Sequence, residues 1–517
     1  MAEFKHGVYG EMGNSIINSS KSSSIYYAFL GTLPVNLIRL EKNKDGTYPK
    51  YKDMGYVDTP MKLVDSSAKS AVGYSDNWKT FTLCEVVKAF FCNTKGNVGP
   101  LFVINVLDPD TDRKAEVTTK SYAISNKRIE FVSDTIILDT LKLEKQVGED
   151  EVDVEAKTLV EGTDYKLSYN YDSNKVIIEF LADEITGTVA ASYYEVEATF
   201  MNADDTKAER IIGTLQEDGS ASGVYALRKI FNDYGVHPSV LGAPGFMHLN
   251  KVYNALVSQG KEINDKFHTV VFSDIPTTEV ENKVDTIAKA VDWKKTNGRV
   301  AENAVSVWKC GMDSEGNVYH GSTIAAVEQL RVDLQNDSIP YEVYDNKSVD
   351  WLTKICDFDG KVAIPYSETK VNQLNENGIT SFNVWKGTIF LWGNGTDSFV
   401  YNGVYDLRAR FSSNIRMQYY LLNDFIMRRH SDIGDPMFLQ KKNDIVREEQ
   451  ERLETLVSKG ALIGEPHFVF NVSRNAQGDV AEGNFRFDID DTPTPPINSL
   501  TLVVSYTDAG TSVYFEE

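Results

Sequence analysis

The sequence predicts a mixed α/β protein of several domains, built around a largely parallel sheet. Its 517 residues are enough for about three or four domains. Between residues 206 and 400, apolar runs of strand length alternate with stretches of helical period, which is the pattern of βαβ units. Between residues 108 and 205, short polar–apolar alternations are separated by turn residues, which predicts an inserted β-rich domain.

The region before this insertion, residues 26–107, is expected to hold the first part of the α/β core. The run SIYYAFLG predicts a strand from Ser24 to Gly31, and LFVINVL predicts a buried strand over 101–107. Between them, segment 77–93 carries its apolar residues at mixed helical spacing and predicts a core helix. Residues 1–25 are rich in Ser, Asn and Gly, so composition alone predicts a frayed terminus or an arm.

The insertion carries much of the negative charge of the chain. Residues 108–200 contain 21 acidic and 10 basic side chains, and the whole chain has a net charge of −22. Such a surface favours solubility and argues against wrapping nucleic acid, because phosphates would be repelled. We therefore expect the insertion to lie on an outer surface and the protein to bind no nucleic acid.

The second half of the core is expected over residues 206–400. Segment 223–234 has apolar residues on one helical face and ends at Gly235, a residue suited to a helix C-terminus. Segment 236–245, VHPSVLGAPG, predicts a buried strand with a turn. A parallel sheet covered on both faces follows from the continued alternation, with helices predicted at 249–258, 279–294 and 322–334.

A tight hairpin is predicted at the end of the core. Asn377-Gly378 marks a turn, and ITSFNVW and TIFLW predict two short strands. Lys386-Gly387 stands between these strands and allows the reversal of the chain.

Residues 401–517 are expected to form a C-terminal α+β domain. Ser412 or Ser413 is predicted to cap a helix with one apolar stripe. Asp435-Pro436 is predicted to open a second helix over 436–459. The chain then returns to strands, predicted at 467–474, 484–490 and 499–507.

The sequence offers no metal or cofactor motif, and we expect neither. The seven histidines are scattered without the spacing of metal ligands. The carboxylates of segment 108–112 resemble the start of a calcium loop, but the Gly and the final Glu of such a loop are missing, so a polar turn is predicted. The cysteines lack CxxC spacing and stand beside apolar residues, which predicts buried free thiols at Cys84, Cys92, Cys310 and Cys356.

We expect no catalytic residues. A serine hydrolase needs a base within hydrogen-bond reach of its nucleophile, and no G-x-S-x-G motif is present. Asp274, His320 and Ser322 have the right residue types, but an α/β domain offers such a trio by chance. An α/β hydrolase with a β appendage is one alternative, which a fluorophosphonate probe or a broad hydrolase screen would test.

The start of the chain, MAEFKHGVYGEMGNS, has no cationic segment followed by an apolar run, so no signal peptide is expected. No apolar stretch approaches the ~18–20 residues of a membrane-spanning helix, so no membrane insertion is expected. A protein of this kind that acts outside a cell would leave it by lysis. A surface-layer protein or adhesin is a second alternative, against which the missing export signal argues.

Five stretches, in order along the chain, resemble segments of one protein family. They are Gly7-Val8-Tyr9, LVEGTDYKLSYN (159–170), SGVYALRKIFNDYGVHPSVLGAPG (222–245), LNENGI (374–379) and WGN (392–394). The family is that of contractile-tail sheath proteins, which coat the tubes of contractile-tailed phages and of R-type bacteriocins. The chain departs from the family pattern at Gly395, where an Arg is usual.

The resemblance implies a structural role rather than catalysis. Sheath proteins assemble as stacked hexameric rings around a tail tube, and they contract to drive the tube through the target cell envelope. Their core has what is called a subtilisin-like fold. The implied partners are further copies of the chain, the tail tube protein, and the baseplate and tail terminator proteins. The implied location is a virion tail or a phage-tail-like particle, assembled in the bacterial cytoplasm and released by lysis.

The resemblance also implies that both ends of the chain link subunits. In the family, an N-terminal arm and a C-terminal strand add to a sheet in neighbouring subunits through main-chain hydrogen bonds. An ordinary internal edge strand is the alternative for the C-terminal segment. The linking residues are expected to be Phe4, Gly7, Val8 and Tyr9 in the arm, and Leu500, Leu502, Val504 and Tyr506 in the strand.

A local basic cluster stands out in this acidic chain. Residues 407–431 hold five arginines and a single acidic residue, Asp424. We hypothesise that part of this cluster faces an acidic tube through individually weak ion pairs. Pairing within the chain, with Asp406, Asp424 or Asp432, is the alternative. The tube-facing candidates are Arg408, Arg410, Arg416 and Arg428, whereas Arg429 lies in line with the apolar stripe and is expected to be structural.

Overall fold

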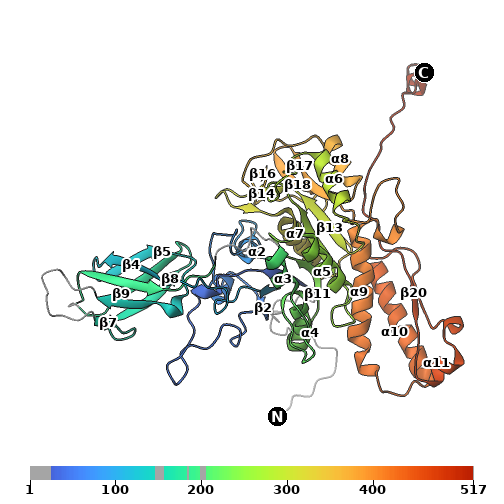
Figure 1. Cartoon of the computed structure of the whole chain (residues 1–517). Helices are drawn as coiled ribbons and strands as arrows, with labels where there is room; N and C mark the ends of the chain where they lie inside the picture. The colour runs from blue at the N-terminus through green and yellow to red at the C-terminus, as the bar shows by residue number, and fades with distance from the viewer. Residues whose placement is uncertain (1–24, 146–156, 183–184, 198–204, 516–517) are drawn as a thin grey trace, which may run out of the picture.

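An eight-stranded sheet forms the centre of the computed structural model, which describes residues 25–145, 157–182, 185–197 and 205–515 (Figure 1). Its strands are β1 (Tyr26–Gly31), β2 (Pro60–Leu63), β3 (Leu101–Asn105), β11 (Pro238–Gly242), β12 (Val270–Ile275), β13 (Ala304–Trp308), β17 (Ile379–Trp385) and β18 (Thr388–Trp392). Their order is β18-β17-β13-β12-β11-β1-β3-β2. The inner strands run parallel, and the edge strands β2 and β18 are antiparallel to their neighbours. The predicted mixed α/β class is confirmed.

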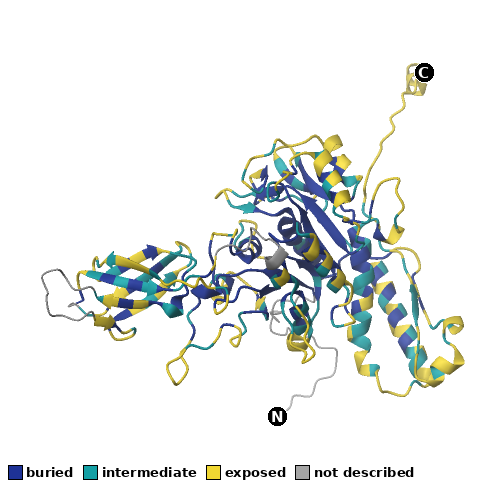
Figure 2. Ribbon diagram, in the orientation of Figure 1, coloured by how far each residue is buried: buried dark blue, intermediate teal, exposed yellow. Residues whose placement is uncertain are grey.

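Helices cover both faces of this sheet. Every residue of β1, β3, β12 and β13 is buried, which requires cover on both sides (Figure 2). The helices α2 (Leu83–Phe91) and α7 (Gly321–Gln335) pack on each other, as do α3 (Asp205–Ile212) and α5 (Asn250–Lys261). The others around the core are α1 (Ala68–Val72), α4 (Arg228–Tyr234), α6 (Ile287–Thr296) and α8 (Glu368–Asn375).

The hairpin of β17 and β18 closes as predicted. Trp385 pairs with Thr388, so two residues form the turn. Lys386 has a φ of 51° and Gly387 a φ of 84°. Positive φ at both central positions is the geometry of a type I′ turn, whose twist matches that of the two strands.

A small antiparallel sheet lies at the carboxyl end of β13. Its order is β15-β14-β16, with β14 (Cys310–Met312) directly following β13. The outer strands are β15 (Val318–Tyr319) and β16 (Lys354–Cys356).

The β-rich insertion forms a lobe beside the core (Figure 1). Its sheets have the orders β4-β10-β6-β7 and β5-β9-β8, and its apolar side chains form their own cluster with Leu37 from the core. Arg39 of the core ties the lobe down, because its Nε donates to Asp139 at 3.0 Å and its Nη2 to Glu161 at 2.8 Å. The strands are β4 (Thr118–Ala123), β5 (Arg128–Val132), β6 (Lys142–Lys145), β7 (Lys157–Leu159), β8 (Tyr165–Asn170), β9 (Lys175–Phe180) and β10 (Thr188–Tyr193).

Two long helices, α9 (Ser412–Arg429) and α10 (Leu439–Ser458), lie side by side after the core (Figure 1). A two-stranded antiparallel sheet of β19 (His467–Val469) and β20 (Asp488–Asp490) follows, with the short helix α11 (Gln477–Ala481) between its strands. Apolar side chains of these helices and strands form a third core, which includes Met417, Leu421, Leu453 and Phe468.

Several local predictions in this part of the chain are wrong. Phe411 stands at the N-cap of α9, so Ser412 and Ser413 lie inside the first turn and their side chains do not cap it. Helix α10 begins at Leu439, so Asp435 does not cap it. The Asp435 carboxylate accepts a hydrogen bond from Lys441 instead. The strands predicted over 467–474 and 484–490 are shortened to three residues each.

Candidate functional site

The predicted strand 499–507 does not form in the described structure of the subunit. The segment leaves the body of the molecule and ends in a short 3₁₀ helix, Ala509–Tyr514 (Figure 1). Leu500 and Leu502 are each 85% exposed and Tyr506 is 89% exposed. A strand needs a neighbour for its backbone hydrogen bonds, and this segment has none among the described residues of its own subunit. Contiguous apolar exposure of this kind marks an interaction site.

A groove of about 830 Å³ lies on the C-terminal domain, between α9 and the β19–β20 sheet. The continuous run 485–491, which contains β20, lines one side of it. A sheet of two short strands is marginal by itself, so a further strand added to it would stabilise it. The groove has an apolar floor that includes Leu421, Leu422, Phe425, Phe468 and Ile489.

The rim of this groove is charged. Arg429, Arg474 and Arg486 stand among its lining residues, together with Asp432, Asp435 and the carboxylates of 488–491. The expected arm residues Phe4, Gly7, Val8 and Tyr9 lie outside the described residues, so their role stays a prediction. The described chain enters the core at Ile25, directly before β1.

Arg416 is buried, which corrects its assignment to a tube-facing surface. It is 3% exposed and lies inside the fold, between α9, α7 and β1. Its Nη1 donates to Asp333 Oδ1 at 3.0 Å, its Nη2 donates to Tyr27 Oη at 3.3 Å, and the same Nη2 contacts Asp333 Oδ2. The hydroxyl of Tyr27 donates to Asp333 at 2.6 Å. A buried charge requires such a partner, because an unpaired one would be strongly destabilising.

Arg428 and Arg429 are also committed to partners within the chain. Both terminal nitrogens of Arg428 donate hydrogen bonds to Glu449 of α10, at 2.5 and 2.6 Å, and its Nε donates to Asp424. Arg429 Nε donates to the same Glu449 at 2.7 Å, so its guanidinium is paired within the chain. Burial raises the pKa of Glu449, but the two arginines outweigh this and lower it overall. These contacts fasten α10 to α9 and leave little free charge for another protein.

Arg408 and Arg410 differ in exposure. The side chain of Arg408 is 52% exposed, and its Nη2 donates to Glu302 at 2.8 Å. The guanidinium of Arg410 stacks over Phe399 at 3.7 Å and over Phe411 at 4.3 Å. Burial lowers the pKa of Arg410. Arg410 therefore has a packing role in this subunit, and Arg408 is the tube-facing candidate with the most accessible charge.

The trio of Asp274, His320 and Ser322 is brought together, but as a helix cap. The Ser322 hydroxyl and backbone N–H both donate to Asp274, at 2.5 and 2.8 Å. The ring Nδ1 of His320 lies 2.6 Å from Glu85, which also accepts from the His320 backbone N–H. The two carboxylates thus sit at the N-terminus of α7, where negative charge is favoured. Because Ser322 pairs with the carboxylate rather than with His320, the arrangement is not that of a Ser-His-Asp nucleophile.

The charges in this cap influence one another. Burial raises the pKa of Asp274 to about 6, against the opposing effects of His320 and Ser322. Burial lowers the pKa of His320, but Glu85 and Asp274 raise it more strongly, to about 10. His320 is therefore a cation at neutral pH, held between carboxylates.

The carboxylates of the predicted polar turn are engaged by the fold. Asp112 accepts two bonds from Arg210, at 2.8 and 3.0 Å, and Asp108 accepts from the backbone of Asp110. In the part of the chain that the structure describes, no three His, Cys, Asp or Glu side chains gather as a metal site. Among the same residues, none of the helices combines the length and apolar character needed to cross a bilayer.

Sequence reasoning missed the groove and the partner of Arg416. The groove joins residues of α9 to residues 485–491, which lie far apart in the chain. Asp333 lies 83 positions before Arg416. The one available signal was the presence of charged residues, Asp333 among them, within the predicted core helix 322–334, where a buried charge needs a partner.

The chain is similar to known proteins in sequence and in fold. The chain is 25% identical to the tail sheath protein of Burkholderia phage BcepMu over 527 residues, covering 98% of this chain and 97% of that protein. It is 23% identical to the major tail sheath protein of Serratia phage KSP20 over 306 residues, covering 59% and 72% of the two proteins. The sheath complex of an extracellular contractile injection system, PVC, in its contracted state has a similar fold, with a TM-score of 0.50, 12% identity and 99% of both chains covered. No family model matches the chain.

Proposed function

We propose that this member of the contractile tail sheath family polymerises as stacked hexameric rings around a tail tube. Contraction of this polymer would drive the tube through the envelope of a target cell. The α/β core, of the subtilisin-like type, then serves as a scaffold and performs no catalysis. The structural role of the similar phage proteins supports this proposal.

The observation that carries the proposal is the exposed C-terminal segment. In an extended chain, alternate residues share a face, so Leu500, Leu502, Val504 and Tyr506 form one apolar stripe. The groove is lined by β20 and by apolar side chains of α9 and β19. The segment points away from the body of its own subunit (Figure 1), so we infer that stripe and groove meet between two copies. Such β-augmentation links subunits through main-chain hydrogen bonds.

This contact is of the head-to-tail kind, because the segment and the groove are different surfaces of one chain. Head-to-tail contacts generate rings when the rotation closes and helical polymers when it does not. A link made by an extended segment also tolerates rotation of the bodies that it joins. The N-terminal arm, with Phe4, Gly7, Val8 and Tyr9, is proposed to link a further neighbour in the same way.

A substitution pair tests this link. Replacing the apolar stripe with serine should abolish striated tubes in negative-stain micrographs and leave the thermal unfolding of the free subunit unchanged. The matched control alters the opposite face of the same segment and should still assemble. The stripe variant carries changes at Leu500, Leu502, Val504 and Tyr506, and the control at Thr501, Val503 and Ser505. Normal tubes from the stripe variant would refute the link.

The acceptor side can be tested separately. Leu422 lines the groove on α9 and is 48% exposed, so Leu422→Arg should block an incoming strand without disturbing the core. Mixing this variant with the stripe variant should give no tubes. Mixing the Leu422→Arg variant with the wild-type subunit should give shorter tubes, because a subunit with a blocked groove accepts no further strand.

We propose further that Arg408 contacts the tail tube. Arg408→Glu should lower the fraction of tubes that co-sediment with sheath. Arg447→Glu is a suitable control, because Arg447 of α10 is similarly exposed, at 61% of its side chain. Fully sheathed tubes with Arg408→Glu would show that the tube binds elsewhere.

The remaining partners and the location follow from the same proposal. A sheath needs end contacts, which we assign to baseplate and tail terminator proteins. The particle would be a virion tail or a phage-tail-like particle, assembled in the bacterial cytoplasm and released by lysis.

A further inference from the structure

Cys310 and Cys356 face each other across two antiparallel strands. Cys310 of β14 and Cys356 of β16 are direct partners in the register, and both are free thiols. Directly opposed residues of an antiparallel pair have Cα atoms about 4.5–5.5 Å apart and side chains on the same face. A disulfide spans about 4.4–6.8 Å between Cα atoms. The two thiols can therefore be joined without moving the strands apart or together.

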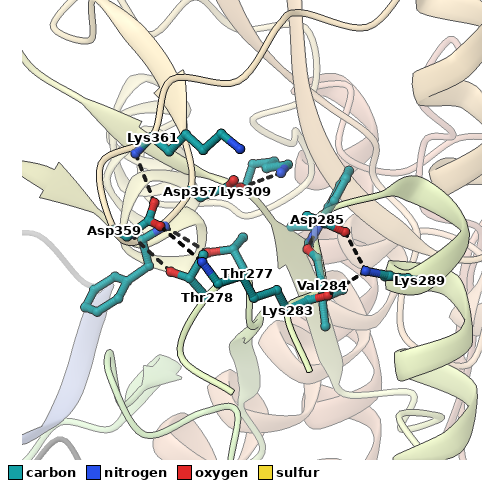
Figure 3. A network of polar contacts seen from close by, with 12 residues as sticks. Thr277, Thr278, Lys283, Val284, Asp285, Lys289, Lys309, Asp357, Asp359 and Lys361 are labelled. Carbon is teal, nitrogen blue, oxygen red and sulfur yellow. Dashed lines mark hydrogen bonds and ion pairs between the residues drawn. The ribbon is translucent and has the colours of Figure 1, made fainter. Parts of the chain in front are cut away.

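The surroundings of the pair hold it in place. Lys309 directly precedes β14 and Asp357 directly follows β16, and the two side chains form a buried ion pair (Figure 3). Beyond it, the backbone N–H of Phe358 donates to Thr277 at 2.8 Å, and that of Asp359 donates to Thr278 at 3.1 Å. The chain after β16 is thus fastened to the loop that follows β12, and the thiols stay opposed.

The two thiols are not equivalent. Both are buried, which raises the pKa of Cys310 well above its ordinary value and that of Cys356 to about 12. The ammonium of Lys309 opposes this effect at Cys356. Cys356 also lies on β16, the outer strand of the sheet, whose far side is covered only by an isolated bridge to Val362. Both thiols are enclosed by the fold, so either of them reacts only when the strands open locally, and slowly.

We propose that Cys310 and Cys356 form a redox-responsive cross-strand dithiol, which a hydroperoxide closes to a disulfide. The thiolate of Cys356 attacks the terminal peroxide oxygen, the O–O bond breaks, and a sulfenic acid forms as hydroxide leaves and takes up a proton. The sulfur of Cys310 then attacks the sulfenic sulfur. The S–S bond forms, the S–O bond breaks and water leaves. With hydrogen peroxide, two thiols lose two electrons and two protons while the peroxide is reduced to two waters.

The disulfide would change the mobility of one segment of the core. It closes the chain between Cys310 and Cys356 and holds β16 to β14 covalently. Because edge strands open locally more readily than inner strands, the effect concentrates there. We expect slower amide hydrogen exchange over residues 354–363 and a higher thermal unfolding midpoint. This inference does not depend on the assembly proposed above.

The test uses the whole wild-type protein. It is treated with hydrogen peroxide, unfolded in N-ethylmaleimide and mapped by peptide mass spectrometry. We expect the peptides of Cys310 and Cys356 joined, with the loss of two hydrogen masses, and released by dithiothreitol. Cys84 is the internal control. It is a buried thiol on α2 and is not opposed by another cysteine across a strand pair, so N-ethylmaleimide should still alkylate it after the peroxide treatment.

Two variants sharpen the result. Cys84→Ser should still form the bond, and Cys310→Ser should leave a sulfenic acid on Cys356 that dimedone traps. The proposal is overturned if N-ethylmaleimide still alkylates both Cys310 and Cys356 after the peroxide has oxidised Cys92, which is partly exposed. It is equally overturned if the bond joins any other pair of cysteines. Because the mapping is done on the wild type, a variant that fails to fold does not remove the test.

Discussion

Strand β1 and the C-terminal segment 500–506 are two apolar stretches of similar kind that end in opposite environments. β1 reads YYAFLG and every residue of it is buried. The segment reads LTLVVSY and every residue of it is exposed. β1 lies between β3 and β11, which take up its backbone hydrogen bonds on both sides. The C-terminal segment has no such neighbours in the part of its own subunit that the structure describes.

The difference shows that strand propensity makes a strand only when a partner strand is available. The fold supplies partners for β1 from segments far along the chain. It supplies none for the C-terminal segment, whose apolar stripe costs free energy as long as it faces water. In the proposed polymer, a second copy would provide the edge and remove that cost. The comparison therefore separates residues that stabilise the subunit from residues that stabilise the polymer.

The largest effect is expected at the buried charge that anchors β1. Arg416→Ala leaves Asp333 buried without its cation, so the free energy of unfolding of the subunit should fall by about 3–5 kcal/mol. Arg408→Ala, at an exposed ion pair, should cost about 1 kcal/mol or less. Urea unfolding of both variants measures this. Equal losses would mean that the Arg416 pair is open to solvent.

A pair of leucines tests the comparison directly. Leu30 of β1 is fully buried, and Leu30→Ala should lower the free energy of unfolding by about 2–5 kcal/mol, because it removes packed methyl groups and leaves a cavity. Leu502→Ala should change the stability of the free subunit by about 0.5 kcal/mol or less. It should nevertheless weaken assembly, as seen in the protein concentration at which tubes form. A large loss for Leu502→Ala in the free subunit would show that the segment folds back on its own subunit.

The capped end of α7 gives the core a pH dependence that the C-terminal segment lacks. The pKa of His320 is raised in the fold from 6.5 to about 10, so its protonation stabilises the fold fully below pH 6.5 and this contribution is lost as the pH rises towards 10. Glu85→Gln removes the main partner that raises this pKa, although Asp274 and Glu279 remain nearby.

We therefore expect the stability difference between the wild type and Glu85→Gln to shrink between these two pH values. Urea unfolding across the window measures it, and the titration of lysines and tyrosines is common to both proteins. A difference that stays constant with pH would contradict the charged state assigned to His320.

The smallest effect is expected at the helix starts. The hydroxyl of Ser412 makes no hydrogen bond in the described structure, so Ser412→Ala should be neutral to within about 1 kcal/mol. Thr286 caps α6 by accepting from the backbone of Lys289, and Thr286→Ala should cost about 1 kcal/mol. Thermal unfolding of the two variants compares them. A clear loss at Ser412 would restore its predicted role as a cap.

The parts of the fold that could be predicted depend on neighbours in the chain. The turn at Lys386-Gly387 and the strands beside it were predicted correctly, because two residues and two short apolar runs determine the hairpin. The parallel sheet followed from the alternation of strands and helices in the same way. The resemblance to tail sheath proteins also rested on short ordered motifs, and it is confirmed.

The parts that failed depend on contacts between distant segments. Counting charges in 407–431 could not show that Arg416 faces Asp333 of another helix, since burial is decided by tertiary packing. Segment 499–507 has the composition of a strand, but composition cannot say which molecule holds the partner. The caps at Ser412 and Asp435 failed because the chain enters both helices at a different residue from the one that local preference favours.

The contact of Arg416 with Asp333 and Tyr27 has a mechanical consequence. Tyr27 stands two residues after Ile25, where the described chain begins. Arg416 belongs to α9, which lines the groove of the C-terminal domain. The hydrogen bond between Arg416 and the Tyr27 hydroxyl therefore connects β1 directly to α9, the helix that lines the groove. In the proposed polymer, each subunit body would keep its shape, and movement would occur at the segments that join neighbouring subunits.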